Sequence, residues 1–274
     1  MKFVIKLRKR KLQGERVLIT KEEIKKYLKE IPPVPESVKN CLQYLKQGEL
    51  KKAAMEADKD LVLKKQIETV VNSAYFSLPN RVEDIVQLFS MIGLEMAKSL
   101  VYSYLVSLLQ PKEWKIFNIP FHDFQASFMS EYEKYMKYEF GESEYKKYAE
   151  VGAIVPAAVC VCDSLLGDKK EQVEIIMNSA PLEYGTLLKR MTGVTLFDIA
   201  ATIAELWGLE DEKGSVLKKA ECDKCEDPKA ALVHFLFFYL SSKPQFLDIN
   251  SLIEFKPESI NLIPKTYERI TNGS

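Results

Sequence analysis

Hydrophobic residues recur at the 3.6-residue spacing of helices along most of the chain. In the first hundred residues this spacing predicts a helix that Thr20 caps, and another after the proline-rich segment 32–35. Further helices are predicted at 50–57, from Asp58 or Asp60 to about residue 72, and at 82–92 and 95–109, the last two separated at Gly93.

The second half of the chain continues the helical pattern. It predicts helices at 122–140, 143–166, 169–178, 182–191, 195–208, 212–221 and 228–242. Pro156 is expected to break or kink the second of these, because proline lacks an amide hydrogen. Three prolines, at 244, 257 and 264, predict a mostly irregular tail over 243–274. We therefore predict an all-α fold of two packed helical lobes.

An apolar connector over 110–120, between Pro111 and Pro120, divides the predicted lobes. The expected organisation is an N-terminal extension over 1–19, a first lobe over 20–110, a second lobe over 111–222, and a C-terminal helix and tail packed on the body over 223–274. Alternating apolar residues in the extension are compatible with a short hairpin. Its basic run is more typical of a solvated edge than of a nucleic-acid arm.

Composition removes several classes of function. The 274 residues are 47% hydrophobic and 28% charged, as in ordinary globular proteins. Because 39 basic residues balance 39 acidic ones, net charge supplies no attraction to nucleic acid or anionic lipid. The most apolar stretches, 96–109, 153–162 and 230–240, are shorter than the roughly 20 residues of a membrane span. We expect no nucleic-acid partner and no membrane insertion.

The five cysteines predict a cytoplasmic protein without a disulfide framework, because their number is odd and the chain is long enough to bury its own core. Cys41, Cys160 and Cys162 are expected to be small core residues. The lone Cys-x-x-Cys pair, Cys222 and Cys225, is interpreted as surface thiols rather than as half of a zinc site, since zinc needs four ligands.

Few residues are available for catalysis. The glycines lie too far apart for a phosphate-binding loop, and only two histidines are present, which excludes a site built on several imidazoles. His122 and Asp123 form a doublet that could hold a metal, but directly before a helix we interpret them as a cap. His234, among apolar neighbours, is expected to be a hydrogen-bonded core residue. We predict no metal and no cofactor.

Four motifs in order resemble the HDOD (HD-related output domain) family of bacterial signalling proteins. They are Ile31-Pro32-Pro33-Val34-Pro35, Asn72-Ser73-Ala74-Tyr75-Phe76, Ile92-Gly93-Leu94-Glu95 and Glu205-Leu206-Trp207-Gly208-Leu209. The resemblance implies an all-helical fold related to the HD metal-dependent phosphohydrolases, with a regulatory role. It also implies where relatives keep ligands: a His-Asp pair at Val155 and Pro156, and a histidine at Leu196.

Those replacements predict a non-catalytic signal-transduction protein that acts by binding other proteins, because apolar side chains cannot hold a catalytic metal. Two alternatives stay open: a small-molecule or nucleotide sensor that uses the degenerate HD pocket, and a divergent phosphohydrolase that uses His122 and Asp123.

The candidate ligand or partner contacts are Asn72, Ser73, Tyr75, Trp114, His122 and Asp123. For the segment 72–76 we expect a structural role before a functional one, since Asn72 and Ser73 can satisfy backbone groups at a helix end. Trp114 is expected to be substantially buried and to pack the connector against both lobes. The partner, the input signal and the oligomeric state are not identified by the sequence.

Overall fold

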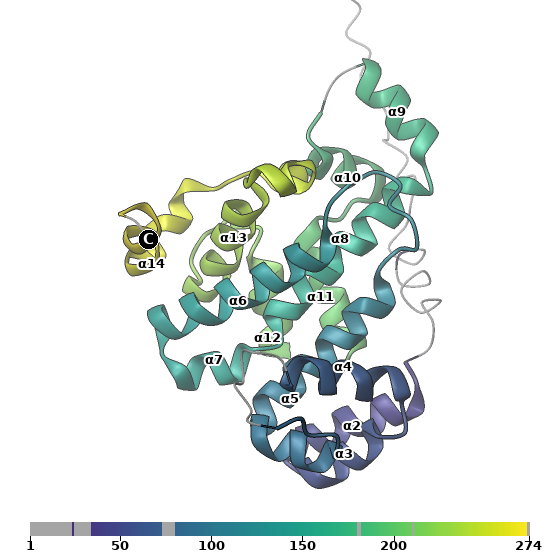
Figure 1. Cartoon of the computed structure of the whole chain (residues 1–274). Helices are drawn as coiled ribbons and strands as arrows, with labels where there is room; N and C mark the ends of the chain where they lie inside the picture. The colour runs from purple at the N-terminus through teal and green to yellow at the C-terminus, as the bar shows by residue number, and fades with distance from the viewer. Residues whose placement is uncertain (1–23, 25–33, 73–79, 180–181, 210, 273–274) are drawn as a thin grey trace, which may run out of the picture.

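The computed structural model describes residues 24, 34–72, 80–179, 182–209 and 211–272. Within these ranges the regular secondary structure is entirely helical, as predicted (Figure 1). The hairpin predicted for the extension and the helix predicted from Thr20 lie outside the described residues, except for Ile24, which is helical.

The first lobe, of which the structure describes four helices, lies at the lower end of the molecule in Figure 1. Its helices are α2 (Glu36–Lys46), α3 (Leu50–Ala57), α4 (Leu61–Val71) and α5 (Ile85–Leu109). Asp60 begins α4 by accepting hydrogen bonds from the amides of Val62 and Leu63. Gly93, at φ 75° and ψ 176°, interrupts α5 as expected, because this left-handed conformation suits glycine.

The second lobe surrounds a central apolar helix, α8 (Val151–Gly167). Its other helices are α6 (Phe121–Phe140), α7 (Glu142–Tyr148), α9 (Lys170–Ser179), α10 (Tyr184–Thr192), α11 (Leu196–Leu206), α12 (Asp211–Lys219) and α13 (Pro228–Ser241). Helix α8 is apolar on every side and packs against α5, α6 and α11, so it joins the two lobes through one hydrophobic core.

Two sequence-based expectations about prolines are wrong. The predicted helix 143–166 is divided at residues 149–150, and Pro156 lies inside α8. Pro156 is the sixth residue of α8, so it removes one hydrogen bond inside the helix, and the burial of α8 in the core offsets this loss. In the tail, which contains η2 (Pro244–Leu252), η3 (Pro257–Leu262) and α14 (Pro264–Thr271), each proline begins a helical segment. The tail is helical because proline's fixed φ favours the first helical position.

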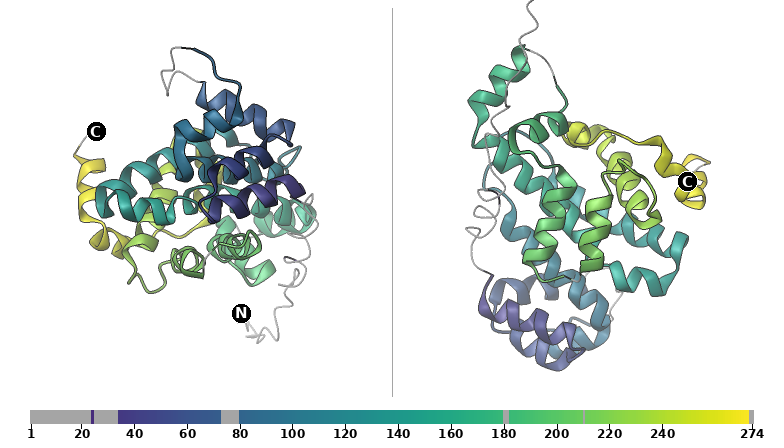
Figure 2. Two further views of the ribbon diagram at one scale, coloured as in Figure 1. Left: turned by 90° about the horizontal axis from the view of Figure 1, so that it is seen from below. Right: turned by 180° about the vertical axis from the view of Figure 1, so that it is seen from behind.

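The tail returns to the second lobe. Figure 2 shows α14 beside α6, where Thr266 donates from its amide and its hydroxyl to Glu139 Oε2 at 2.8 and 2.7 Å.

Two stretches, Ile85–Leu109 and Glu142–Gly167, are long and apolar enough to cross a membrane, contrary to the length estimate from sequence. The window of the second is buried throughout, as in the core of a soluble protein.

Candidate functional site

The HD-like ligand positions are filled by the hydrophobic core. Val155 and Pro156 are buried on α8, and Leu196 is buried at the start of α11. Their side chains carry no nitrogen or oxygen atom that could bind a metal. Among the described residues, no group of three His, Cys, Asp or Glu side chains is placed to hold an ion. The donor set here does not fit the metal of an HD phosphohydrolase.

His122 and Asp123 are exposed and do not cap α6, contrary to the interpretation from sequence. Helix α6 begins one residue earlier, at Phe121, after Pro120, and no side chain accepts a hydrogen bond at this cap. His122 and Asp123 therefore lie inside the first turn, past the capping position. A carboxylate there still interacts favourably with the helix dipole.

His234 is the buried, hydrogen-bonded histidine that the sequence predicts. Its ring contacts Ala220 O through Nδ1 at 2.8 Å and accepts a hydrogen bond from the amide of Lys256 through Nε2 at 2.9 Å. Burial lowers the pKa of His234 to about 4. The His234 side chain thus joins α13 to Ala220, which precedes this helix, and to Lys256, which follows it.

Asn72 joins the end of α4 to Val82. Its Nδ2 donates to the carbonyls of Glu68 and Val82, both at 2.8 Å, and its Oδ1 accepts from the amide of Val82 at 2.8 Å. This network supports the structural role expected for the residue. Ser73 and Tyr75, the other candidates of this segment, lie outside the described residues.

The connector is fastened to the second lobe by a buried carboxylate that sequence reasoning missed. Asp163 of α8 is fully buried and accepts three backbone hydrogen bonds, from Lys115 at 3.0 Å, Ile116 at 2.9 Å and Phe117 at 2.8 Å. Trp114 is partly buried rather than substantially buried, and its ring packs on Phe121, 5.4 Å between centroids. The carboxylate of Asp163, rather than the indole, orders this segment.

A second buried contact missed from sequence is an ion pair. Lys213 Nζ of α12 lies 3.0 Å from Glu150 Oε2, with both side chains less than a tenth exposed. Nearby, the Tyr148 hydroxyl donates to Glu212 of α12. These contacts fix α12 against the start of α8, although the two helices are far apart in the sequence.

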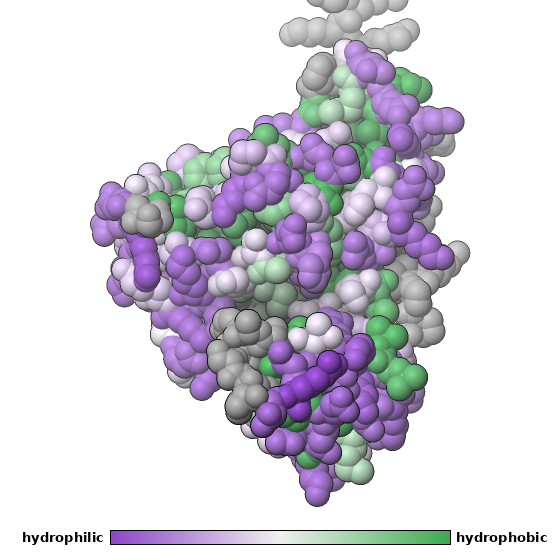
Figure 3. Space-filling view, viewed as in Figure 1, coloured by the Kyte–Doolittle hydropathy of each residue, from purple (hydrophilic) through white to green (hydrophobic). Residues whose placement is uncertain are grey.

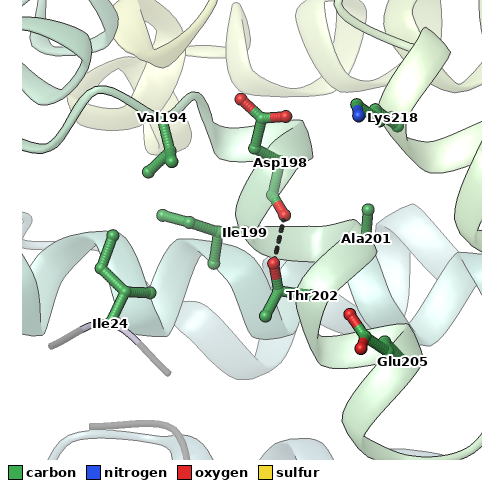
Figure 4. A pocket seen from close by; sticks show the side chains of 8 residues that line it. All are labelled: Ile24, Val194, Asp198, Ile199, Ala201, Thr202, Glu205 and Lys218. Carbon is green, nitrogen blue, oxygen red and sulfur yellow. Dashed lines mark hydrogen bonds between the residues drawn. The ribbon is translucent and has the colours of Figure 1, made fainter. Parts of the chain in front are cut away.

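Two hollows adjoin α11. One, of about 310 Å³, is lined by the apolar side chains of Ile24, Val194 and Ile199 and by the charged groups of Asp198, Glu205 and Lys218 (Figure 4). The other, of about 280 Å³, lies where α2 and α5 meet the end of α11, and is lined by apolar residues, two lysines and a glutamine: Val34, Lys39, Leu42, Gln43, Lys46, Leu105, Leu206 and Trp207.

The junction of the lobes is closed by specific contacts beside the second hollow. Trp207 stacks on Tyr102 of α5, 6.1 Å between ring centroids, and Lys46 of α2 donates to the carbonyl of Gly208. A ligand at this junction would touch both lobes.

The Cys222–Cys225 pair is joined as a disulfide, and Cys222 is buried, so the interpretation as surface thiols is wrong. The turn that contains the pair folds the two cysteines against each other. Cys41, Cys160 and Cys162 are buried free thiols, as expected.

The comparison with family models decides the assignment. Residues 31–129, from the segment before α2 into α6, match the model of the HDOD domain. Residues 31–129 are an HDOD domain. The match includes three of the four motifs noted in the sequence, and Glu205–Leu209 lies beyond it. No curated protein sequence matches the chain.

Solved structures share the fold of this chain along most of its length. An HDOD domain protein of unknown function from Geobacter sulfurreducens is 14% identical, with a TM-score of 0.57, over 91% of this chain and 94% of that one. A protein named "Putative metal-dependent phosphohydrolase", from Shewanella amazonensis SB2B, is 18% identical, with a TM-score of 0.51, over 89% and 96%. At these identities the likeness shows the fold alone.

Proposed function

We propose that this HDOD chain is a non-catalytic regulatory protein that acts in signal transduction by binding other proteins in a bacterial cytoplasm. The observation that carries the proposal is the buried state of Val155, Pro156 and Leu196. Metal-dependent phosphohydrolysis requires imidazoles and carboxylates that converge on ions and activate water. Core packing at these positions leaves neither ligands nor space for water.

The exposed His122 and Asp123 offer no substitute site. A catalytic metal needs three or more ligands around one point, held in a shaped cavity. The doublet lies on the surface of α6, and no described group of three potential ligands includes it. The donor set therefore favours a regulator over a divergent hydrolase.

The first lobe has side chains suited to a protein contact. Met55 of α3 and Leu61 and Val62 of α4 are 55%, 78% and 65% exposed, and Figure 3 shows hydrophobic atoms at the surface of this lower lobe. Exposed large apolar side chains that cluster in a patch are typical of interaction sites. Leu61 and Val62 are adjacent in the first turn of α4.

Hydrolysis assays test the non-catalytic half of the proposal. The purified chain would be incubated with Mn²⁺, Fe²⁺ or Mg²⁺ and with phosphomonoesters, phosphodiesters, nucleotides and cyclic dinucleotides. We expect no metal-dependent turnover, and the same result for His122→Ala. Metal-dependent hydrolysis that His122→Ala or Asp123→Ala abolishes would overturn the proposal.

In-cell crosslinking tests the protein-binding half. Val62→Asp should remove specific crosslinked partners while leaving thermal stability unchanged. Ile175→Asp is the matched control, since Ile175 on α9 is also 65% exposed. Equal crosslinking by wild type and both variants would count against a contact at the start of α4.

A small-molecule sensor is the second candidate, supported by the 310 Å³ hollow over α11. The apolar side chains of Ile24, Val194 and Ile199 and the charges of Glu205 and Lys218 suit a small ligand that carries both an apolar group and charges. A binding screen with nucleotides and cyclic dinucleotides tests this candidate. Binding weakened by Lys218→Ala would favour the sensor, and saturating concentrations without binding would remove these ligand classes.

A further inference from the structure

The turn between α12 and α13 brings two cysteines together. Cys222 and Cys225 are bonded, with Cα atoms 4.3 Å apart. Cys222 has φ 57°, and it is the one non-glycine residue with a positive φ in the part of the chain that the structure describes. This left-handed conformation costs energy for a residue with a side chain. The turn is therefore held by its surroundings.

The contacts that hold the turn do not require the disulfide. The amide of Cys222 donates to Lys219 O at 3.0 Å, and His234 Nδ1 lies 2.8 Å from Ala220 O. On the other side, Asp227 caps α13 by accepting from the amide of Lys229 at 3.0 Å. A bond between residues only three apart also restrains the unfolded chain less than a long loop does. Structural stabilisation is thus a minor role for this bond.

Cys225 is the most accessible of the five cysteines. Cys225 is partly exposed, whereas Cys41, Cys160 and Cys162 are buried. Burial raises the pKa of Cys41 to about 12 and holds the pKa values of Cys160 and Cys162 above their usual range. Because the thiolate is the reactive form, these three are protected from oxidants while Cys225 is open to them.

The state of the pair is coupled to a polar cavity. Glu221 and Asp223, the neighbours of Cys222, line a hollow of about 260 Å³ together with Lys189 of α10 and Lys256. One carboxylate oxygen of Glu221 is buried without a hydrogen-bond partner, and burial raises the pKa of this side chain. A change of backbone conformation at Cys222 would move both carboxylates of this cavity.

We propose that Cys222 and Cys225 are a reversible oxidation site that is modified by low-molecular-weight disulfides such as glutathione disulfide and that sets the shape of the adjoining cavity. The Cys225 thiolate attacks one sulfur of glutathione disulfide, forms a mixed disulfide and releases one glutathione thiolate. The Cys222 thiolate then attacks Cys225 Sγ and releases the second glutathione. The protein dithiol is oxidised by two electrons, and glutathione disulfide is reduced to two glutathione molecules.

The inference rests on the cytoplasmic location given in the proposed function, but not on the binding of other proteins. In a reducing cytoplasm, disulfides are usually transient and catalytic or redox-sensing rather than structural. A site of this kind would let the redox state of the cell alter the surface that joins α10, α12 and the tail.

Alkylation of the full-length protein tests the modification. After equilibration in glutathione buffers of increasing oxidation, free thiols would be labelled with a maleimide mass tag and counted under denaturing conditions. We expect two of the five cysteines to lose reactivity together and reversibly, in monomeric protein. Cys225→Ser should abolish this transition, and Lys224→Ala, which changes an exposed residue of the same turn, should keep it.

Hydrogen exchange of the reduced and oxidised protein tests the coupling. Oxidation should slow amide exchange in residues 219–227 and in the cavity segments 183–190 and 252–256. Circular dichroism of Cys225→Ser would show that the variant is folded. A pair that stays oxidised or reduced at every buffer ratio, a disulfide between chains, or a transition that leaves exchange of the cavity segments unchanged would each overturn the proposal.

Discussion

Replacing Asp163 by asparagine should release the connector between the lobes. The carboxylate of Asp163 accepts three amide hydrogen bonds from residues 115–117 and is fully buried. Oδ1 accepts from Ile116 and Phe117, and Oδ2 accepts from Lys115. Asparagine has the same shape, but its NH₂ group would face the amide of either Lys115 or the other two residues, donor against donor.

The magnitude follows from the bonds that are lost or weakened. A hydrogen bond to a charged group contributes about 1.5–3 kcal/mol, and a neutral one about 1 kcal/mol. Asp163→Asn loses the charged bond to Lys115 and converts the other two into neutral bonds, so we expect a loss of about 2.5–7 kcal/mol in the free energy of unfolding.

Asp168→Asn is the matched control on the same segment. Asp168 pairs with Lys115 Nζ at 2.6 Å, but both side chains are about half exposed. A pair of this kind contributes at most about 1 kcal/mol. The two variants thus make the same chemical change, to carboxylates that bind the same connector residue, and they differ in burial.

Equilibrium unfolding in urea would measure both variants. Circular dichroism would follow the helices, and tryptophan fluorescence would follow Trp114 and Trp207, the two tryptophans of the chain. We expect Asp163→Asn to lower the unfolding midpoint far more than Asp168→Asn and to shift the fluorescence first, if the connector detaches before the lobes unfold. Equal effects of the two variants would refute the claim that the buried carboxylate orders the connector.

Three further predictions concern residues with defined contacts. Because the folded pKa of His234 is about 4 and an unfolded histidine titrates near 6.5, the unfolded chain gains a proton as pH falls through this window; stability should therefore drop by about 2 kcal/mol between pH 8 and 5. In urea unfolding, His234→Gln should reduce the dependence of the unfolding free energy on pH, and His122→Gln should leave it unchanged. The same pH dependence in both variants would contradict the claim that His234 causes it. Gly185→Ala should destabilise the chain by about 1–3 kcal/mol, because the new Cβ would overlap Leu252 O. Gly214→Ala, with open space around it, should instead stabilise α12 by up to about 1 kcal/mol. Thermal unfolding compares the two variants, and equal shifts of the melting temperature would argue against close packing of α10 on η2. Asn72→Ala should cost about 2 kcal/mol or more through three lost hydrogen bonds, and an unchanged melting temperature would contradict its structural role.

Local patterns predict the fold well because most elements of this chain are determined by residues near them in sequence. Helix α3 occupies residues 50–57 as expected, with Ala53, Ala54 and Ala57 on its buried face. Gly93 and Gly141 interrupt or end helices where a left-handed or extended glycine conformation is needed. The tail prolines are the exception, since proline can either stop a helix or begin one and only the following packing decides.

The candidate site was less predictable, since its contacts join distant parts of the chain. Asp163 is a single carboxylate in an apolar helix, and its partners are backbone amides 46–48 residues away, which leave no side-chain pattern. The pairing of Glu150 with Lys213 is similarly remote. His122 and Asp123 were misjudged as a cap because a shift of one residue at a helix start changes a capping position into an exposed helical one.

Metal analysis of the purified protein tests the central claim, that the HD-like site is filled with core side chains and holds no ion. The protein would be prepared without chelators, incubated with Mn²⁺ or Fe²⁺ and separated from free ions. Its metal content would then be measured by inductively coupled plasma mass spectrometry. We predict well below one ion per chain, with no change in Asp123→Ala. One or two tightly held ions per chain, reduced in Asp123→Ala or His122→Ala, would contradict it.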